Sequence, residues 1–207
     1  MKPLPLDFEA VLAVAQDMRQ ADRQEIFATR WDEDPASLAQ DCVGAGCIGA
    51  VIAGRDGAPI CAIGATEMWP RVWSVWMFAT DRWHEVALDA TRFVKERLIP
   101  TLLDLGLRRA ECRSSAMHSQ AHRWLEYLGA RREAEHLDYG KNGESFIGFY
   151  WRAEDVRKSL QETEDQFPQS RKRAATDRQE GGCSGGEGAS ATTPHDGTGI
   201  DHLDRGQ

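Results

Sequence analysis

The sequence of 207 residues is short of the features that define several protein classes. Its five cysteines form no C-x-x-C pair, so neither a zinc ribbon nor a disulfide framework is indicated and a reducing compartment is expected. No stretch approaches the roughly 18 apolar residues of a transmembrane helix, and no apolar run precedes Asp7, so no secretory signal is expected. A net charge of -8 argues against general nucleic-acid binding, which normally goes with a basic surplus.

Tryptophan and tyrosine are absent after Trp151, whereas eight of the nineteen glycines lie at or after Gly181. This shift predicts a globular domain over 1–152 and a solvated tail over 153–207, charged at first and then rich in Gly, Ser and Thr. The domain has 18 basic against 22 acidic side chains and the tail 7 against 11, so each carries a net charge of -4. Neither half therefore indicates a nucleic-acid partner.

Helix signals come first along the domain. Asp7 and Asp34 are good N-cap residues in front of apolar positions at helical spacing, and a further helix is predicted over 22–31. Small and β-branched residues on either side of a Gly-Arg-Asp-Gly turn then predict a hairpin of two strands, over 47–53 and 59–65. Residues 72–80 alternate with large apolar side chains on both faces, which is typical of a central strand.

The second half of the domain begins with a long helix. Its apolar positions run from Val86 to a predicted glycine C-cap at Gly106, and Pro100 is expected to kink or split it. A strand, a helix that stops at Gly129 and a closing hairpin complete the order, with the predicted ranges 108–114, 119–128 and 133–151.

Residues Arg82 to Ala87, which read R-W-H-E-V-A, lie between the central strand and the long helix. Backbone N–H groups at such a helix start can cradle phosphate, and a glycine lets the phosphate approach closely. The segment resembles the pyrophosphate loop Q/R-x-x-G-x-G/A of the GNAT acyl-CoA N-acyltransferases, with Arg82 and Ala87 in the outer positions. Glu85 replaces the central glycine, either as an anionic intrusion into the cradle or as an ordinary acidic residue in a first turn.

A second segment, H-S-Q-A-H-R-W-L-E-Y-L-G-A from His118 to Ala130, resembles the GNAT helix N-x-x-A-x-x-L-Y-E-K-x-G-F. Leu125 stands where these enzymes commonly place a tyrosine that protonates the leaving thiolate, and His118 replaces an asparagine. Tyr127 lies two residues further along, about 200° round the helix, so it does not substitute for the tyrosine.

The resemblance covers about residues 1–152 and implies an α+β fold with a mixed central sheet and flanking helices. Within the superfamily, residues 75–81 and 124–130 resemble GNAT-like internal virion proteins of short-tailed phages. The leading hypothesis is therefore a phage-encoded GNAT-fold protein with a degenerate acyl-CoA loop, which binds a virion or host protein and acts in the virion or the host cytoplasm.

The alternative hypothesis is an active N-acetyltransferase with acetyl-CoA as co-substrate. In that case the strand at 73–80 would pair with the pantetheine arm, and the diphosphate would lie against the predicted loop residues Arg82, Trp83, His84 and Ala87. The candidate general bases for the acceptor amine are Glu67 and Glu111, both at strand positions.

Other signals are weaker. His118 and His122 stand four residues apart, but no third ligand is evident, so no metal site is predicted. Ser114 or Ser115 with His118 lacks the elbow of a nucleophilic serine. Among the tryptophans, Trp73 and Trp76 are predicted to lie in the core, whereas Trp83 is predicted to be exposed and to contact a partner.

Overall fold

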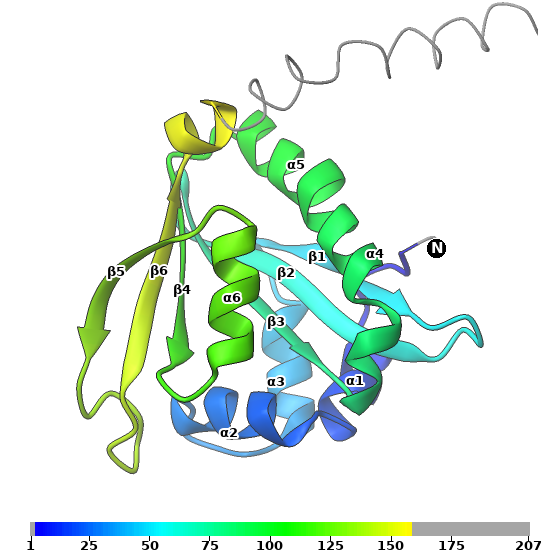
Figure 1. The fold of residues 1–207 in the computed structure, drawn as a ribbon. Coiled ribbons are helices and arrows are strands. Elements are labelled where there is room, and N and C mark those ends of the chain that lie inside the picture. Colours follow the sequence, from blue (N-terminus) through cyan, green and yellow to red (C-terminus); the bar gives the residue numbers. More distant parts are fainter. Residues whose placement is uncertain (1–2, 159–207) are drawn as a thin grey trace, which may run out of the picture. The chain divides into compact units, whose positions relative to one another are not determined.

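The computed structural model describes residues 3–158, and Figure 1 shows them as a mixed sheet with helices packed around it. This agrees with the α+β fold that the sequence predicts. Most of the predicted tail, from residue 159 on, lies outside the described residues. Its first residues continue the globular part, because Ala153 and Val156 are buried in the core.

Three short helices precede the sheet: α1 (Phe8–Gln16), α2 (Gln20–Ala28) and α3 (Pro35–Cys42). The predicted N-caps are confirmed, since the Asp7 carboxylate accepts the Ala10 N–H at 2.9 Å and that of Asp34 accepts the Ala36 N–H at 3.0 Å. Helix α2 begins two residues before the predicted start at Asp22. That aspartate is not a cap but a buried side chain.

Six strands form one sheet in the order β1-β2-β3-β4-β6-β5. The first three are antiparallel neighbours, β3 and β4 are parallel, and β4, β6 and β5 are again antiparallel. The predicted succession of strands and helices is confirmed, with bounds that differ by a few residues. The strands are β1 (Cys47–Ala53), β2 (Pro59–Trp69), β3 (Val72–Ala79), β4 (Arg109–Ser115), β5 (Arg131–His136) and β6 (Phe146–Arg152).

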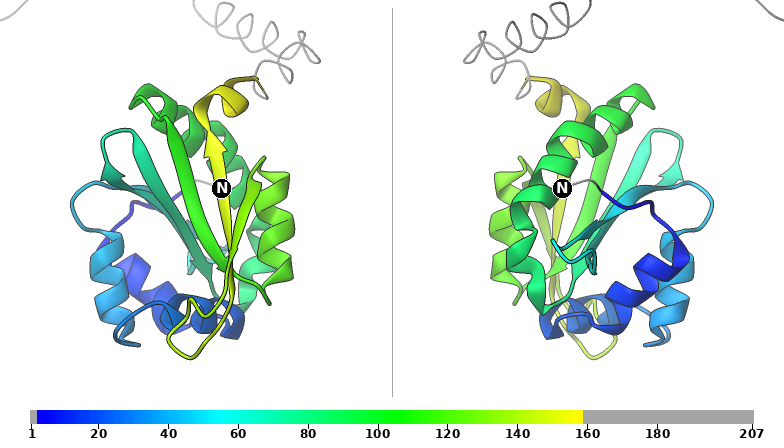
Figure 2. Two further views of the ribbon diagram at one scale, coloured as in Figure 1. Left: turned by 90° about the vertical axis from the view of Figure 1, so that its left-hand side faces the viewer. Right: turned by 90° about the vertical axis from the view of Figure 1, so that its right-hand side faces the viewer.

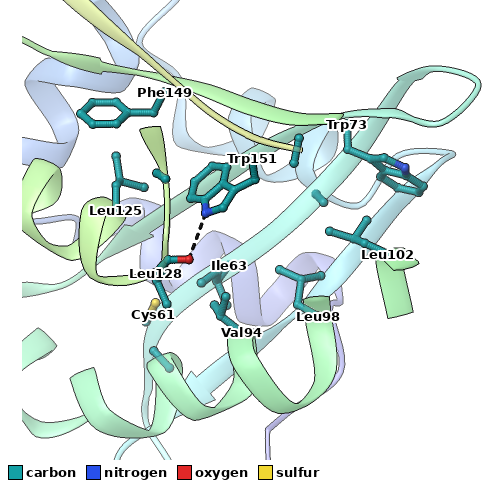
Figure 3. Close-up of a cluster of buried hydrophobic side chains, with 14 of the residues drawn as sticks. Cys61, Ile63, Trp73, Val94, Leu98, Leu102, Leu125, Leu128, Phe149 and Trp151 are labelled. Carbon is teal, nitrogen blue, oxygen red and sulfur yellow. Dashed lines mark hydrogen bonds between the residues drawn. The ribbon is translucent and has the colours of Figure 1, made fainter. Parts of the chain in front are cut away.

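Apolar side chains fill both faces of the sheet. One cluster lies under the helices that follow β3, and Trp73 is buried there (Figure 3). The other cluster contains Phe78 together with residues of α1 and α3. Figure 2 shows these two helices, in blue, packed beside the sheet. Because side chains alternate along a strand, β3 contributes to both clusters, as the sequence predicts for a central strand. In the first cluster the Trp151 indole N–H donates to the Leu128 carbonyl at 3.0 Å.

The long helix is interrupted before the predicted position. It consists of α4 (Ala87–Phe93), a π-helical segment (Val94–Leu98) and α5 (Ile99–Asp104), and Gly106 follows with a positive φ of 81°. Pro100 lies in the first turn of α5, where its missing N–H is tolerated. The wider π turn upstream accommodates the proline, so the irregularity precedes it rather than coinciding with it.

Gly64 in β2 leaves room for a tryptophan of the neighbouring strand. A Cβ at this position would lie 2.5 Å from the Trp76 ring and 2.6 Å from the Ile48 carbonyl oxygen. The carbonyl belongs to the β1 backbone and cannot turn away, so the sheet must shift to admit a methyl group.

Gly64→Ala should therefore lower the free energy of unfolding by about 1–3 kcal/mol, the usual cost of overpacking. Urea denaturation of the purified variant measures it. Gly148→Ala is the matched control, because its Cβ would meet mainly the His136 side chain, which can rotate. Equal losses in the two variants would contradict the packing argument.

Candidate functional site

Strands β3 and β4 pair over a short distance and then diverge. Their parallel register covers three residue pairs, from Val72 with Arg109 to Ser74 with Glu111. Beyond Ser74 no pairing with β4 exists within the described residues. The sheet thus opens into a V between its two central strands.

The open side of β3 presents unpaired backbone groups to this V. The Thr80 N–H donates to the Ile60 carbonyl of β2 at 2.8 Å. In an antiparallel ladder alternate residues point their N–H and C=O groups to opposite neighbours. Val75, Met77 and Ala79 therefore direct theirs away from β2 and toward β4. The Val75 N–H completes the last parallel pair by bonding to Glu111, whereas within residues 3–158 the Val75 carbonyl and both backbone groups of Met77 meet no partner strand.

A cavity of about 470 Å³ occupies the V. Met77 and Phe78 of β3 line one arm, and Cys112 and Ser114 of β4 line the other. Burial raises the pKa of the Cys112 thiol to about 12, so the thiol stays protonated at neutral pH and is a poor nucleophile. The remaining walls come from helices on both faces, among them Leu38 of α3 and Val94, Leu98, Ala121, Trp124 and Leu125 of the opposite side.

Two carboxylates of α2, which lie one turn apart on the helix, bind the ends of β3 and β4 where these strands have diverged. Asp22 is only 3% exposed; its carboxylate accepts the Ala79 N–H at the end of β3 at 2.8 Å and lies 2.8 Å from the Arg19 guanidinium. Glu25 accepts the backbone N–H of Ser115 and the hydroxyl of Ser114 at the end of β4, both at 2.8 Å. Burial raises the pKa of Asp22, and the Arg19 cation opposes that shift.

His118 lies between these two carboxylates, at the start of α6 (Ser119–Tyr127). Its Nδ1 is 3.0 Å from Glu25 Oε2, and its Nε2 is 3.7 Å from Asp22 Oδ1. The sequence shows the histidine and the serines, but nothing in it pairs them with an acidic helix some 90 residues away. The cluster was missed because only the fold brings α2 to the ends of β3 and β4.

The predicted phosphate loop adopts a 3₁₀ helix over Asp81–Glu85, and α4 begins at Ala87. Arg82 uses its guanidinium for two carboxylates at once: Glu85 at 2.8 and 2.9 Å, and Asp56 of the β1–β2 turn at 2.9 Å. Glu85 therefore lies against Arg82 instead of only facing the helix start. The three charges sum to -1, so the loop as it stands is not a cationic cradle.

The other predicted loop residues lie in different environments. The prediction that Trp83 is exposed is wrong: it is 8% exposed, packs edge-on against Trp124 and lies under Arg19. In a 3₁₀ helix residues three apart eclipse, and Trp83 and Val86 turn inward together. His84 is exposed and Ala87 is half-buried at the start of α4. Their role in binding diphosphate stays a prediction.

The predicted general bases do not line the V cavity. Glu67 is exposed, and its carboxylate accepts the Arg71 N–H in the β2–β3 turn at 3.0 Å. Glu111 lies at the last paired position before the V, where Arg109 holds its carboxylate at 2.7 Å. Their catalytic role stays a prediction that these contacts do not favour.

The helix with the second motif has the predicted geometry. Leu125 is buried and lines the cavity, whereas Tyr127 is 66% exposed and lies under Lys95. His122 Nε2 is 2.9 Å from the Ser115 carbonyl oxygen. No group of three or more His, Cys, Asp and Glu side chains within residues 3–158 is arranged to hold a metal ion, and no helix there is both long and apolar enough to cross a membrane.

Solved structures with a similar arrangement include acetyltransferases. A GNAT-family acetyltransferase from Bacillus anthracis superposes with a TM-score of 0.57 at 13% identity, over 73% of this chain and 94% of that one. The ribosomal-protein-S18-alanine N-acetyltransferase from Escherichia coli gives 0.55 at 15% identity, over 73% and 92%. A spermidine N-acetyltransferase chimera from Vibrio cholerae gives 0.56 at 10% identity, over 75% and 99%.

The chain has the GNAT fold. At these identities the likeness shows the fold alone. No protein-family model matches the sequence, and no curated protein is similar enough to count as a relative. The function must therefore be argued from the site of this chain.

Replacing Arg82 tests the charge cluster of the loop. Hydrogen bonds from Arg82 lower the pKa of Glu85 and of Asp56. In Arg82→Gln both pKa values should rise toward their ordinary values of 4.5 and 3.8, as measured by NMR titration of the side-chain carboxyls.

The pH dependence of the wild type's free energy of unfolding should reflect the same ion pairs. A lowered carboxyl pKa stabilises the fold above the pKa of the unfolded state, and that contribution disappears as the pH falls through the folded value. The stability difference between wild type and Arg82→Gln should therefore shrink below about pH 4. An unchanged difference down to pH 2 would contradict the ion-pair geometry.

Proposed function

We propose that the protein is an acyl-CoA-dependent N-acetyltransferase whose thioester lies in the V between β3 and β4. The observation that carries the proposal is the unpaired edge of β3, formed by the Val75 carbonyl and the backbone groups of Met77, next to a cavity of about 470 Å³. Backbone N–H and C=O groups inside a sheet are strongly driven to pair, and an extended chain with amide groups can supply partners. The pantetheine arm of acetyl-CoA is such a chain.

The cavity walls suit the acyl end of this co-substrate. Leu125 and Met77 provide apolar surface for a methyl group and a thioester, and these groups would displace water from the cavity. A drier site strengthens the interaction of any backbone N–H with the developing negative charge on the thioester oxygen. No tyrosine occupies the Leu125 position, so the departing thiolate takes its proton from the acceptor or from water.

The loop around Arg82 binds diphosphate less well than a glycine-rich loop does. Glu85 and Asp56 already occupy Arg82, so a diphosphate must compete with two carboxylates for the same guanidinium. This competition weakens acetyl-CoA binding without closing the V, because the loop and the cavity involve different residues. The thioester site is thus compatible with modest affinity.

The hypothesis of a phage-encoded binding protein has less support than the acetyltransferase proposal. It rests on two short sequence segments, and neither the fold nor the acetyltransferase structures favour a virion role or a phage origin. A location in the virion or in the host cytoplasm, and a virion or host partner, remain proposals from the sequence alone.

Blocking the V should abolish co-substrate binding. Acetyl-CoA at 100 times its dissociation constant should stabilise the wild type by about 2.7 kcal/mol, which thermal denaturation detects. Ala121→Phe places a ring in the cavity and should remove this shift. Gln120→Phe adds the same ring to the exposed side of α6 and should retain it. The absence of a shift in the wild type would refute the proposal.

Removing the negative charge of Glu85 should improve binding. Glu85→Gln frees part of the Arg82 guanidinium and removes one like charge near the diphosphate, so the Kd for coenzyme A should fall by a few-fold. Isothermal titration with coenzyme A measures it. Arg82→Ala should weaken binding, and Glu96→Gln, an exposed charge change further along the same long helix, should leave Kd unchanged.

A further inference from the structure

A second cavity, of about 570 Å³, lies on the outer side of α2. It is lined by α2 and by the turn between β5 and β6, with Gln24, Lys141 and Asn142 among its walls. Glu25, His118 and Phe146 line this cavity and also the cavity in the V. These three residues therefore stand at the boundary between the two spaces.

Glu25, one of the two polar residues at this boundary, uses only one of its two carboxylate oxygens for hydrogen bonds within the described residues. One oxygen of Glu25, Oε2, receives the Ser114 hydroxyl, the Ser115 N–H and His118 Nδ1, all within 3.0 Å. Its Oε1 has no hydrogen-bond partner in the part of the chain that the structure describes. Unlike Asp22 and Asp41, which lie 2.8 Å from Arg19 and Arg30, Glu25 has no Arg or Lys partner there.

The contact with Glu25 determines which ring nitrogen of the neutral imidazole carries the proton. A carboxylate that receives Nδ1 selects the tautomer with the proton on Nδ1, which leaves a lone pair on Nε2. That atom is 3.7 Å from Asp22 Oδ1, too far for a hydrogen bond. Asp22 in turn holds Ala79, two residues from the unpaired Met77. The lone pair thus lies on the side of the imidazole that faces Asp22 and the end of β3, and His118 lines the cavity in the V.

We propose that His118 is the general base of the reaction and that Glu25 positions it. The inference rests on the proposed acetyl transfer. The acceptor, a primary ammonium, enters through the second cavity and is held by Glu25 Oε1, and His118 Nε2 removes one of its protons. The nitrogen lone pair forms the C–N bond as the C–S bond breaks, and a second N–H proton passes to the departing thiolate. One proton leaves His118 for water in each turnover.

The geometry of the dyad is that of a base oriented by a carboxylate, a common device in nucleophilic and acid–base catalysis. Within the described residues, the charged side chains that contact the imidazole are Glu25 and Asp22 of α2, and Arg19, at the N-cap of α2, lies behind Asp22. From α6 itself, His122 interacts electrostatically with His118. His122 lies one turn further along α6, where burial lowers its pKa. It lines neither cavity, which makes it a matched control for His118.

The experiment uses the full chain with acetyl-CoA and n-butylamine, and follows coenzyme A release over a range of pH. His118→Gln should lower kcat by 10²–10⁴-fold, the usual contribution of general acid–base catalysis, and should remove the acid limb of the pH profile. The thermal shift with acetyl-CoA should be unchanged. His122→Gln should keep both the rate and the acid limb. A His118→Gln enzyme with normal kcat and pH profile would overturn the proposal.

A binding measurement on the wild type separates this inference from the proposed function. With ¹⁵N-labelled histidine, n-butylammonium should shift the His118 ring nitrogens without acetyl-CoA present, and Glu25→Gln should abolish the shift. If acetyl-CoA produces no thermal shift, the proposed acetyl transfer is refuted. The ¹⁵N shift of His118 with n-butylammonium tests the amine site independently of that result. An unmoved His118 resonance at saturating amine overturns the inference in either case.

Discussion

The site depends on one helix that spans the opening of the sheet. Parallel strands that diverge leave unpaired backbone groups at the ends of both arms, and burial of such groups is costly. Asp22 and Glu25, one turn apart on α2, satisfy the ends of β3 and β4 respectively. Because each carboxylate binds the end of a different strand, α2 bridges the separated ends of β3 and β4 and closes the V at that end. Within the described residues, the Val75 carbonyl and the backbone groups of Met77 stay without a strand partner.

The same helix gives the site its chemistry. Glu25 and Asp22 bracket His118, so a contact that stabilises the fold also orients an imidazole toward the cavity. Under the proposed mechanism, stability and function are coupled here, since removal of either carboxylate frees a strand end as well as the histidine. The loop around Arg82 is different: its charged side chains pair with each other near the surface and do not support the V. In the proposed function this loop affects only the affinity for the co-substrate.

Much of the fold could be predicted because local chemistry specifies it. The caps Asp7 and Asp34, the glycine stop at Gly106 and the apolar alternation of β3 each depend on residues close in sequence. The predictions were wrong or incomplete where contacts between residues far apart in the sequence determine the position of a side chain. Trp83 turns inward because Trp124 and Arg19 are there to receive it. The sequence placed Asp22 at the start of a helix, but nothing in it showed that this side chain accepts the Ala79 N–H.

The sequence by itself determined the order of helices and strands, the resemblance to the GNAT fold and the identity of the residues at the loop and at the Leu125 position. These follow from periodicity and short motifs, which are read within a few turns of chain. Only the tertiary structure decided that α2, β3, β4 and α6 meet at one point and that Glu85 neutralises Arg82. The physical reason is that a buried carboxylate needs partners within about 3 Å, and folding alone determines which distant groups come that close.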